Sequence, residues 1–466
     1  MHARLTILPC LACILAACPG DDAPASSDST SGADGSGTDT SESTTDSTTA
    51  TTGPTTTMSG SGTDSMTGST MSTTVGTSSS SGPTGCNNSD ECTDPAAPIC
   101  VGDTCMPCTA DDQCSEKSSA APACQSAGEL AGHCVQCTAL NDNACEGNSP
   151  VCDDGTSSCV GCSFHEQCPD SACRIATGGC FDPAQVFTVG NGGDYSSIDQ
   201  AVTILGGGDE IVLRVISGPD FNQTVTVSGA GTAYALLDDD PSDMVLPQWV
   251  NTMDAAATLR VESGAEVYVQ GLRLAGNLNA AHAAVEVDDA SVYLDRTAVV
   301  SNNGGGIALT GGAYALVRNC FVARNGDDLG STTGIISTDS TLDVLYSTIA
   351  YNDGDTADSL QCTNTTGSIR NSIAVGSDPS SYDCPGVTAS QNAFDEAVAG
   401  NTNVGAAMAG WFNIPAAGDV HLTAAGKAEF ADIAQWQSGD PLVDIDGDAR
   451  PNSDGAADVA GADIGP

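Results

Sequence analysis

Short β-prone runs return along the carboxyl-terminal part of the chain, and each ends in a polar turn. Four of them close on an Asn, at intervals of 25, 23 and 27 residues: Asn277, Asn302, Asn325 and Asn352. Between them lie second runs in which apolar and other residues alternate, as in 284–287 and 306–309. Strand-like alternation at a period near two dozen residues predicts a parallel solenoid, in which the chain winds once and returns beneath itself.

Stacking explains why the same residue type returns. Successive turns of such a coil superimpose at the strand spacing of roughly 4.8 Å. An Asn at a recurring bend can bond to backbone groups and to the Asn above and below it, so we expect these four residues to form a ladder. A leucine-rich horseshoe would show a fixed Leu grid, which is absent, and a β-sandwich would show no constant interval. The number of sheets per turn stays open.

These phrases carry a resemblance. VVSNNGGGI and FVARNG resemble repeats of the right-handed parallel β-helix in the pectin-lyase-like superfamily. The stretch FTVGNGGDYSSIDQAV resembles the beginning of that fold, a strand and Gly-rich turn before a short capping helix, and the segment from GDVHLTAAGK to the end resembles its closing part. The resemblance implies an all-β, right-handed parallel β-helix solenoid with a C-terminal cap over 183–466, and it leaves the activity open.

A cysteine-rich region precedes the solenoid. Of the 22 cysteines, sixteen fall in four similar units over 86–182, and these units begin at Cys86, Cys108, Cys137 and Cys162. Each unit is too short to fold on an apolar core, so cross-links within it are expected, with connectivity open. Pairs spaced Cys-x2-Cys fit zinc knuckles as an alternative, but each pair straddles a unit boundary. The units resemble the repeats that follow Ser/Thr stalks in bacterial surface lipoproteins.

The amino-terminal residues predict export and anchoring. Segment 1–17 has a short basic start and an apolar run, and with Cys18 it ends in LAAC, which resembles a bacterial lipobox. We read it as a lipoprotein signal peptide with Cys18 as the lipidated residue; an ordinary signal peptide is the alternative. Segment 18–85 is rich in Ser, Thr, Gly and Asp and predicts a disordered stalk. The expected location is the outer membrane or cell surface of a bacterium.

The net charge of the chain limits the kinds of partner that it could bind. The formal net charge is -48, with 60 acidic and 12 basic residues. Such a surface repels nucleic acid, so no nucleic-acid partner is expected. It suits divalent cations or cationic partners, and it also confers solubility without any partner. We expect a monomer whose acylated end contacts the lipid membrane.

The search for catalytic residues finds a small mixed-charge group. Asp295, Arg296, Arg318 and Arg324 fall near one another in neighbouring turns. The superfamily's enzymes use facing carboxylates, or calcium and a basic residue, on polysaccharides. The alternative is a solvated face of the solenoid, which we favour. The segment Leu-Gly-Arg-Pro-Trp, typical of pectin methylesterases, is absent.

Two further features concern metal and disulfide chemistry. Asp444, Asp446 and Asp448 space three carboxylates two residues apart, as calcium ligands or as a polar end cap that holds turns. Cys362 and Cys384 lie 22 residues apart, one turn of the coil, so we expect them to pair. Cys320 would then be a buried free thiol.

We interpret the chain as a lipid-anchored surface protein that presents a β-helix for binding a glycan or another surface molecule, without catalysis. One alternative is a polysaccharide lyase or glycoside hydrolase, and another is a passive spacer. No cofactor is required, although Ca²⁺ is a candidate. A binder should show an exposed aromatic strip, for which four tyrosines recur near strands: Tyr268, Tyr293, Tyr314 and Tyr346.

Overall fold

The computed structural model describes residues 85–141, 145–216, 221–240, 246–252, 256–326, 333–352, 359–376 and 381–466. The predicted signal peptide, the lipidation at Cys18 and nearly all of the stalk lie outside these residues. Within them, no helix is long and apolar enough to span a membrane.

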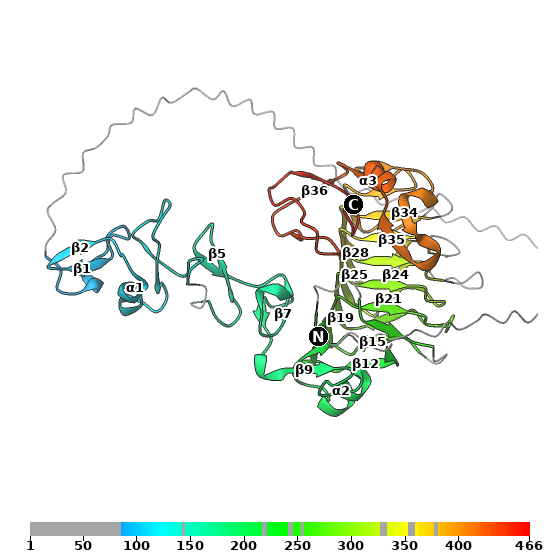
Figure 1. Ribbon diagram of the computed structural model, residues 1–466, viewed down its shortest axis with the longest axis horizontal. Coiled ribbons are helices and arrows are strands. Elements are labelled where there is room, and N and C mark those ends of the chain that lie inside the picture. The colour runs from blue at the N-terminus through cyan, green and yellow to red at the C-terminus, as the bar shows by residue number, and fades with distance from the viewer. Residues whose placement is uncertain are drawn as a thin grey trace, which may run out of the picture. The chain divides into compact units, whose positions relative to one another are not determined.

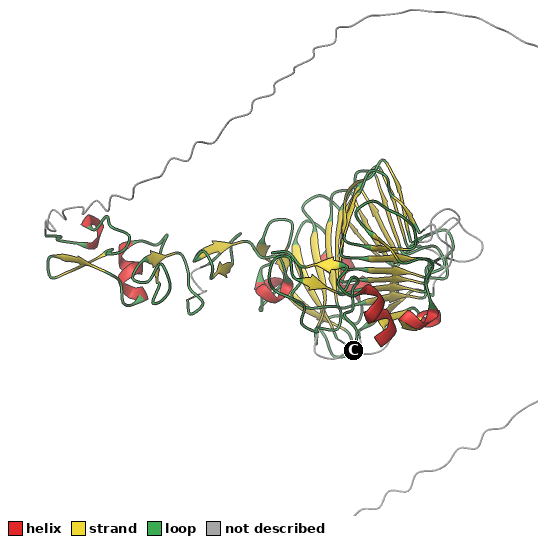
Figure 2. Cartoon of the chain, turned by 90° about the horizontal axis from the view of Figure 1, so that it is seen from above, coloured by secondary structure: helices red, strands yellow, loops and turns green. Residues whose placement is uncertain are grey.

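The cysteine-rich region folds as four small modules, each stapled by two disulfides. Figures 1 and 2 show the short helices and strands of these modules. In every module the first cysteine pairs with the third and the second with the fourth: Cys86–Cys100, Cys92–Cys105, Cys108–Cys124, Cys114–Cys134, Cys137–Cys152, Cys145–Cys159, Cys162–Cys173 and Cys168–Cys180. The expected pairing within units is confirmed, and the sulfurs that a zinc knuckle would need are consumed.

Secondary structure in the modules is short. Each module has a two-stranded antiparallel hairpin whose strands carry the third and fourth cysteines opposite each other. The elements are η1 (Ser89–Glu91), β1 (Ile99–Val101), β2 (Thr104–Met106), α1 (Asp111–Lys117), β3 (Ala123–Cys124), β4 (Cys134–Val135), β5 (Val151–Asp153), β6 (Ser158–Val160), η2 (His165–Gln167), β7 (Cys173–Arg174) and β8 (Gly179–Cys180).

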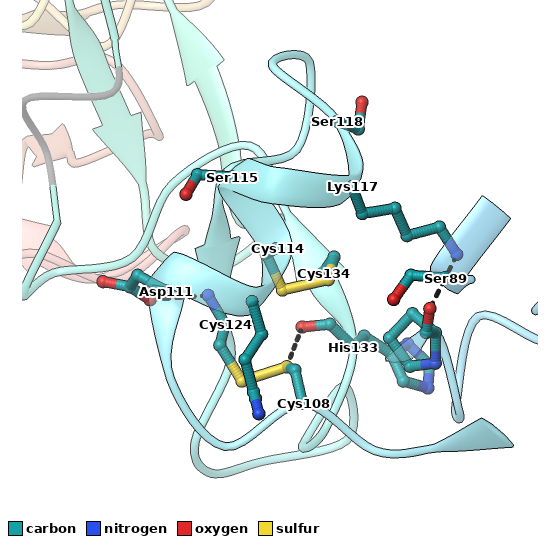
Figure 3. The surroundings of a disulfide bond; sticks show 12 residues. Ser89, Cys108, Asp111, Cys114, Ser115, Lys117, Ser118, Cys124, His133 and Cys134 are labelled. Atoms are coloured by element: carbon teal, nitrogen blue, oxygen red, sulfur yellow. Dashed lines mark hydrogen bonds between the residues drawn. A yellow bond between two sulfur atoms is a disulfide. The ribbon is translucent and has the colours of Figure 1, made fainter. Parts of the chain in front are cut away.

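In module two (108–134) both disulfides lie against α1, as Figure 3 shows. The side chain of Lys117 donates to the carbonyls of Cys92 and Pro98 in module one, at 2.7 and 3.0 Å. The cysteines themselves form most of the small core, together with Ile99. Cross-links therefore stand where a larger domain would have apolar side chains.

The rest of the chain is a parallel β-solenoid, which confirms the predicted all-β fold. Three parallel sheets run along the coil, and each turn between the two ends adds one strand to each sheet. Figure 1 shows β12, β15, β21 and β24 stacked one above another. The predicted capping helix is α2 (Ile198–Leu205), which follows η3 (Pro183–Gln185) and β9 (Val186–Val189) and begins at the N-cap Ser197.

The first sheet contains β9, β10 (Glu210–Val215), β13 (Ala233–Asp238), β16 (Glu266–Gln270), β19 (Ser291–Asp295), β22 (Tyr314–Arg318), β25 (Thr341–Leu345), β28 (Thr366–Arg370) and β31 (Thr388–Ser390). The second contains β11 (Phe221–Asn222), β14 (Gln248–Val250), β17 (Arg273–Ala275), β20 (Ala298–Val300), β23 (Phe321–Ala323), β26 (Thr348–Ala350), β29 (Ile373–Val375), β32 (Ala393–Phe394) and β33 (Thr402–Asn403). The third contains β12 (Val225–Ser228), β15 (Leu259–Glu262), β18 (Val285–Asp288), β21 (Ile307–Thr310), β24 (Ile335–Thr338), β27 (Leu360–Thr363) and β30 (Tyr382–Asp383). Inward residues from all three sheets form one apolar core.

The four Asn residues stack in a buried file. The Oδ1 of Asn325 accepts from the backbone N–H and the Nδ2 of Asn302, at 3.3 and 2.9 Å. The Oδ1 of Asn352 does the same for Asn325, at 2.9 and 3.0 Å. Asn277 donates its backbone N–H to Asn302. Each amide thus joins two turns and satisfies a bend that water cannot reach.

A second ladder runs along the turn from the first sheet to the second. The backbone N–H of Cys320 donates to Ser347, that of Ser347 to Ser372, and that of Ser372 to Asn392. The residue before each of these bends is left-handed, for example Tyr346 with φ 47°. Sequence analysis missed this file because its residue types differ from turn to turn.

Other parts of the chain cover two of the three faces. The C-terminal segment lies on the second sheet, where Phe412 and Phe430 pack with strand residues such as Ile373. It consists of η4 (Ala409–Trp411), β34 (Phe412–Ile414), η5 (Pro415–Ala417), β35 (Asp419–Leu422), α3 (Ala424–Phe430), β36 (Ala434–Gln435) and β37 (Ala457–Asp458). Module four (162–182) packs on part of the first sheet. Outward residues of the third sheet are exposed, such as Arg260, or half-buried, such as Glu286.

Candidate functional site

A cavity of about 370 Å³ lies where the C-terminal segment meets the corner between the first and second sheets. This size falls within the range of ligand pockets, roughly 300–1,000 Å³. Polar and charged side chains form much of the wall: Asp238, Gln248, Gln270, Arg273, Arg296, Asp419, His421 and Asp446. Apolar side chains form the remainder, chiefly Leu246, Ala298, Phe321 and Ile445. Polar groups beside an apolar surface are typical of pockets that orient one small ligand.

His421 is the most constrained group in this pocket. Its Nδ1 lies 2.6 Å from Oδ1 of Asp419, and its Nε2 lies 3.2 Å from Oδ1 of Asp446. The ring of Phe321 packs edge-on against the imidazole, with centroids 4.7 Å apart. Burial alone would lower the pKa of His421, but hydrogen bonds to Asp446 and Asp419 outweigh it and raise the pKa to about 9. The imidazole therefore keeps its proton at neutral pH.

Two guanidinium groups complete the polar wall. Arg296 follows β19 in a left-handed turn, and its Nη2 contacts the carboxylate of Glu166 in module four. Burial lowers the pKa of Arg273, and the charge of Asp419 opposes this effect. Arg273 donates only a long hydrogen bond, 3.4 Å, to the carbonyl of Ala417, and within the described ranges it forms no salt bridge. It is thus the pocket's most available cation.

Only Arg296 of the four proposed catalytic candidates reaches this pocket. Arg318 and Asp295 form an ion pair of 2.9 Å, and their side chains are 5% and 6% exposed. The guanidinium of Arg318 lies over the ring of Phe164, 4.3 Å from its centroid, under module four. Arg324 is exposed at the far end of β23. The expected mixed-charge patch is therefore divided among a buried ion pair, a pocket wall and an exposed turn.

The acidic stretch near the C-terminus gathers a set different from the expected one. Ligand oxygens of Asp444, Asp446 and Asp463 lie within 4.8 Å of one another. Asp448 contributes its backbone N–H, which donates to Asp444 at 2.8 Å, while its side chain is exposed. Burial raises the pKa of Asp444. Three such carboxylates suit a hard cation. However, Asp444 and Asp463 also accept backbone N–H groups that hold the turn, and Asp446 contacts His421, so calcium here stays a prediction.

The expected exposed aromatic strip is not found at the four tyrosines. Tyr268 and Tyr293 do stack, with centroids 4.5 Å apart, and Tyr314 follows at 5.4 Å. However, Tyr268 is 0% and Tyr293 is 8% exposed, because module four packs on them. Tyr346 is buried beneath the C-terminal segment, where Arg450 lies over its ring. Sequence periodicity places these rings on one sheet but cannot show what covers them.

The two cysteine predictions for the solenoid are confirmed. Cys362 and Cys384 form a disulfide with Cα atoms 4.5 Å apart, and Cys320 is a buried free cysteine.

Sequence analysis did not select Arg273, Asp419, His421 or Asp463 for any site. The Asp-x-His spacing of Asp419 and His421 on one strand was the available signal, since residues two apart on a strand share a face.

Comparisons with known proteins add limited information. Residues 70–186 match the model of a family of unknown function (DUF8331). Curated proteins give no match to this chain. Among solved structures, the pectin methylesterase from Aspergillus niger is similar, with 13% sequence identity, a TM-score of 0.24, and coverage of 48% of this chain and 89% of that chain. The fold assignment here rests on the strand pairing described above.

The contacts of His421 predict a stability that falls at alkaline pH. The folded-state pKa of about 9 lies above the ordinary 6.5, so the stabilising effect is complete below about pH 6.5 and is lost as pH rises towards 9. Because the side chain is 39% exposed, solvent screening limits the loss to about 1–2 kcal/mol. We expect the urea midpoint, followed by tryptophan fluorescence, to fall over this interval. The variant His421→Gln should start lower and show no such fall; an equal fall in both proteins would contradict the assignment.

Proposed function

We propose that the chain is an exported bacterial surface protein, anchored through acylated Cys18, whose solenoid binds a glycan in the His421 pocket without cleaving it. The nine disulfides of the described residues support an oxidising, extracellular location. The stalk and the first modules would hold the solenoid away from the membrane. The acyl chains would be its contact with lipid, and we propose that it acts as a monomer.

The composition of the pocket supports a saccharide ligand. Sugars present hydroxyl groups at their edges and C–H groups on their faces, so they pair with polar side chains beside an apolar surface. Gln248, Arg273 and Asp419 offer donors and acceptors, and Phe321 and Ile445 offer the apolar surface. The pocket wall sets three cationic groups, Arg273, Arg296 and His421, against three carboxylates, Asp238, Asp419 and Asp446. This balance of charge favours a neutral sugar.

The observation that carries the proposal is the position of His421 between Asp419 and Asp446. A glycoside hydrolase needs one protonated and one ionised carboxyl group on either side of the scissile bond. Here both carboxylates contact the same imidazole, so they are held together on one side chain and do not face each other across a bond to be cleaved. The arrangement instead provides a fixed set of charged hydrogen-bonding groups, as a binding site requires.

A saccharide panel tests this proposal on the purified chain. Arg273→Met should weaken binding of the best-bound saccharide by about 10- to 100-fold in calorimetry, because a charged hydrogen bond is lost from a half-buried site. Arg260→Met is the matched control, since this arginine is exposed on the third sheet, and it should leave affinity unchanged.

Three outcomes would contradict the proposal. Equal effects of the two substitutions would remove the pocket from it. New reducing ends or unsaturated products would favour the enzyme alternative. Absence of binding to every saccharide would favour the spacer.

A further inference from the structure

Module four is seated on the first sheet by apolar contacts. Phe181 meets Tyr268 edge-on, with centroids 5.7 Å apart, and Tyr268 stacks on Tyr293. Ala172 joins the same buried cluster. These contacts leave Tyr268 without exposed surface. The module therefore covers an aromatic surface that the bare sheet would present to solvent.

Charged contacts surround this apolar centre. Arg174 pairs with Glu266, at 2.9 Å, and with Glu210. Arg214 donates to the carbonyl of Ser171 at 2.8 Å, and Arg318 donates to that of Ser163 at 3.0 Å. These charged and polar contacts thus hold the module to three strands of the first sheet: β10, β16 and β22.

One carboxylate of the module also reaches the proposed binding pocket. Glu166 accepts a hydrogen bond from Nε2 of Gln270 at 3.0 Å and contacts the guanidinium of Arg296. Both Gln270 and Arg296 line the pocket. Seating of module four therefore fixes the side chains of two pocket residues and places a counter-charge beside one of them, Arg296.

His165 lies within this interface as a neutral ring. It is 4% exposed, its Nδ1 accepts from the backbone N–H of Cys173 at 3.1 Å, and its ring lies edge-on to Tyr268. Burial is the largest cause that lowers the pKa of His165, to about 3. The positive charges of Arg318, Arg296 and Arg214 lower it further. No carboxylate of the described residues forms a salt bridge with His165; Asp295 is engaged by Arg318, and Glu166 by Arg296.

We propose that module four is an acid-released cover of the first sheet. Protonation of His165 would place a fourth positive charge beside three arginines and break its hydrogen bond with Cys173. The released module exposes Tyr268 and Tyr293 and withdraws Glu166 from Arg296 and Gln270. The consequence for ligand binding rests on the proposed function, while the release itself does not.

The direction and size follow from proton linkage. The seated state holds His165 neutral, and a released module would return it to the ordinary value of 6.5. Seating is then fully favourable above that value and weakens as pH falls below it. At about pH 5 the seating equilibrium should be roughly 30-fold weaker than at neutral pH. This pH lies above the ordinary pKa of carboxyl groups, which limits their contribution.

Hydroxyl-radical footprinting of the full chain tests the proposal without any ligand. The oxidation of Tyr268 and Tyr293 is followed in urea at pH 7.5 and pH 5, with Tyr346 as a control because the C-terminal segment covers it instead. We expect Tyr268 and Tyr293 to become reactive before Tyr346, at a urea midpoint that shifts down at pH 5 by the equivalent of about 30-fold.

The variant His165→Gln keeps a hydrogen-bond acceptor but cannot titrate, so its midpoint should not change between the two pH values. The proposal is overturned if the wild-type midpoint is independent of pH, if the variant keeps the full shift, or if all three tyrosines become reactive together. If module four of the variant is released under every condition, the pH dependence of the wild-type seating equilibrium decides instead. The logarithm of the wild-type seating constant must change by close to one per pH unit below 6.5, and a slope near zero rejects the proposal.

Discussion

Replacing Cys108 and Cys124 together by Ser should unfold module two while the β-solenoid keeps its structure. Closing a loop of 16 residues is worth about 3 kcal/mol by the chain-entropy model. The module has no apolar core to replace it, because its buried centre consists mainly of the cysteines themselves. The backbone amides of residues 108–134 should lose their protection from hydrogen exchange. Tryptophan fluorescence should stay native, since all three tryptophans lie in the solenoid region.

The matched comparison is the pair Cys362 and Cys384, replaced by Ser in the same way. Their loop is of similar length, 22 residues, but it joins turns that are also held by parallel strand pairing on both sides. We expect a lower urea midpoint and a folded solenoid. If module two retained its protected amides without Cys108–Cys124, the view that cross-links substitute for a core would be wrong.

Asn325→Ala should destabilise the solenoid by about 3–4 kcal/mol, as measured by urea unfolding with tryptophan fluorescence. The substitution removes the acceptor for two N–H groups of Asn302 and the donor to the carbonyl of Val299, at 2.9 Å. It also leaves the Oδ1 of Asn352 without its side-chain donor. All of these groups are buried, so water cannot replace the lost bonds.

Asn303→Ala provides the control for this prediction. Asn303 neighbours the ladder, is partly exposed, and makes one side-chain bond, 3.3 Å long, to the carbonyl of Leu278. Its substitution should cost less than about 1 kcal/mol. Similar losses for the two variants would mean that the ladder contributes no more than an ordinary turn.

The period of the sequence repeat was enough to predict the solenoid fold. The interval from Asn277 to Asn302, or from Asn302 to Asn325, equals the number of residues in one turn of the coil. In the structure these residues stack directly on one another. This works because a solenoid is held by contacts between neighbouring turns, so a local repeat specifies the architecture. The second ladder, which runs through Ser347, Ser372 and Asn392, was not predicted. Hydroxyl and amide groups can accept the same backbone N–H at this bend, so the residue type varies from turn to turn.

The candidate site was much less accessible to such reasoning. Arg296 was selected, but its pocket partner His421 is 125 residues further along the chain, and no periodic pattern links a strand to a segment folded back over it. Asp463 replaced Asp448 in the acidic group for the same reason. Arg318 looked like an outward polar residue, and only the docked Phe164 and Ser163 show that it is buried.

The order of residues alone therefore accounts for the coil, its Asn file and the stapled modules, because each depends on spacing within one or two repeats. Three-dimensional packing decided which faces of the coil are covered, which charges are buried and where a pocket opens. Those features arise from contacts between segments tens to more than a hundred residues apart, where shape and desolvation, rather than local pattern, select the partners.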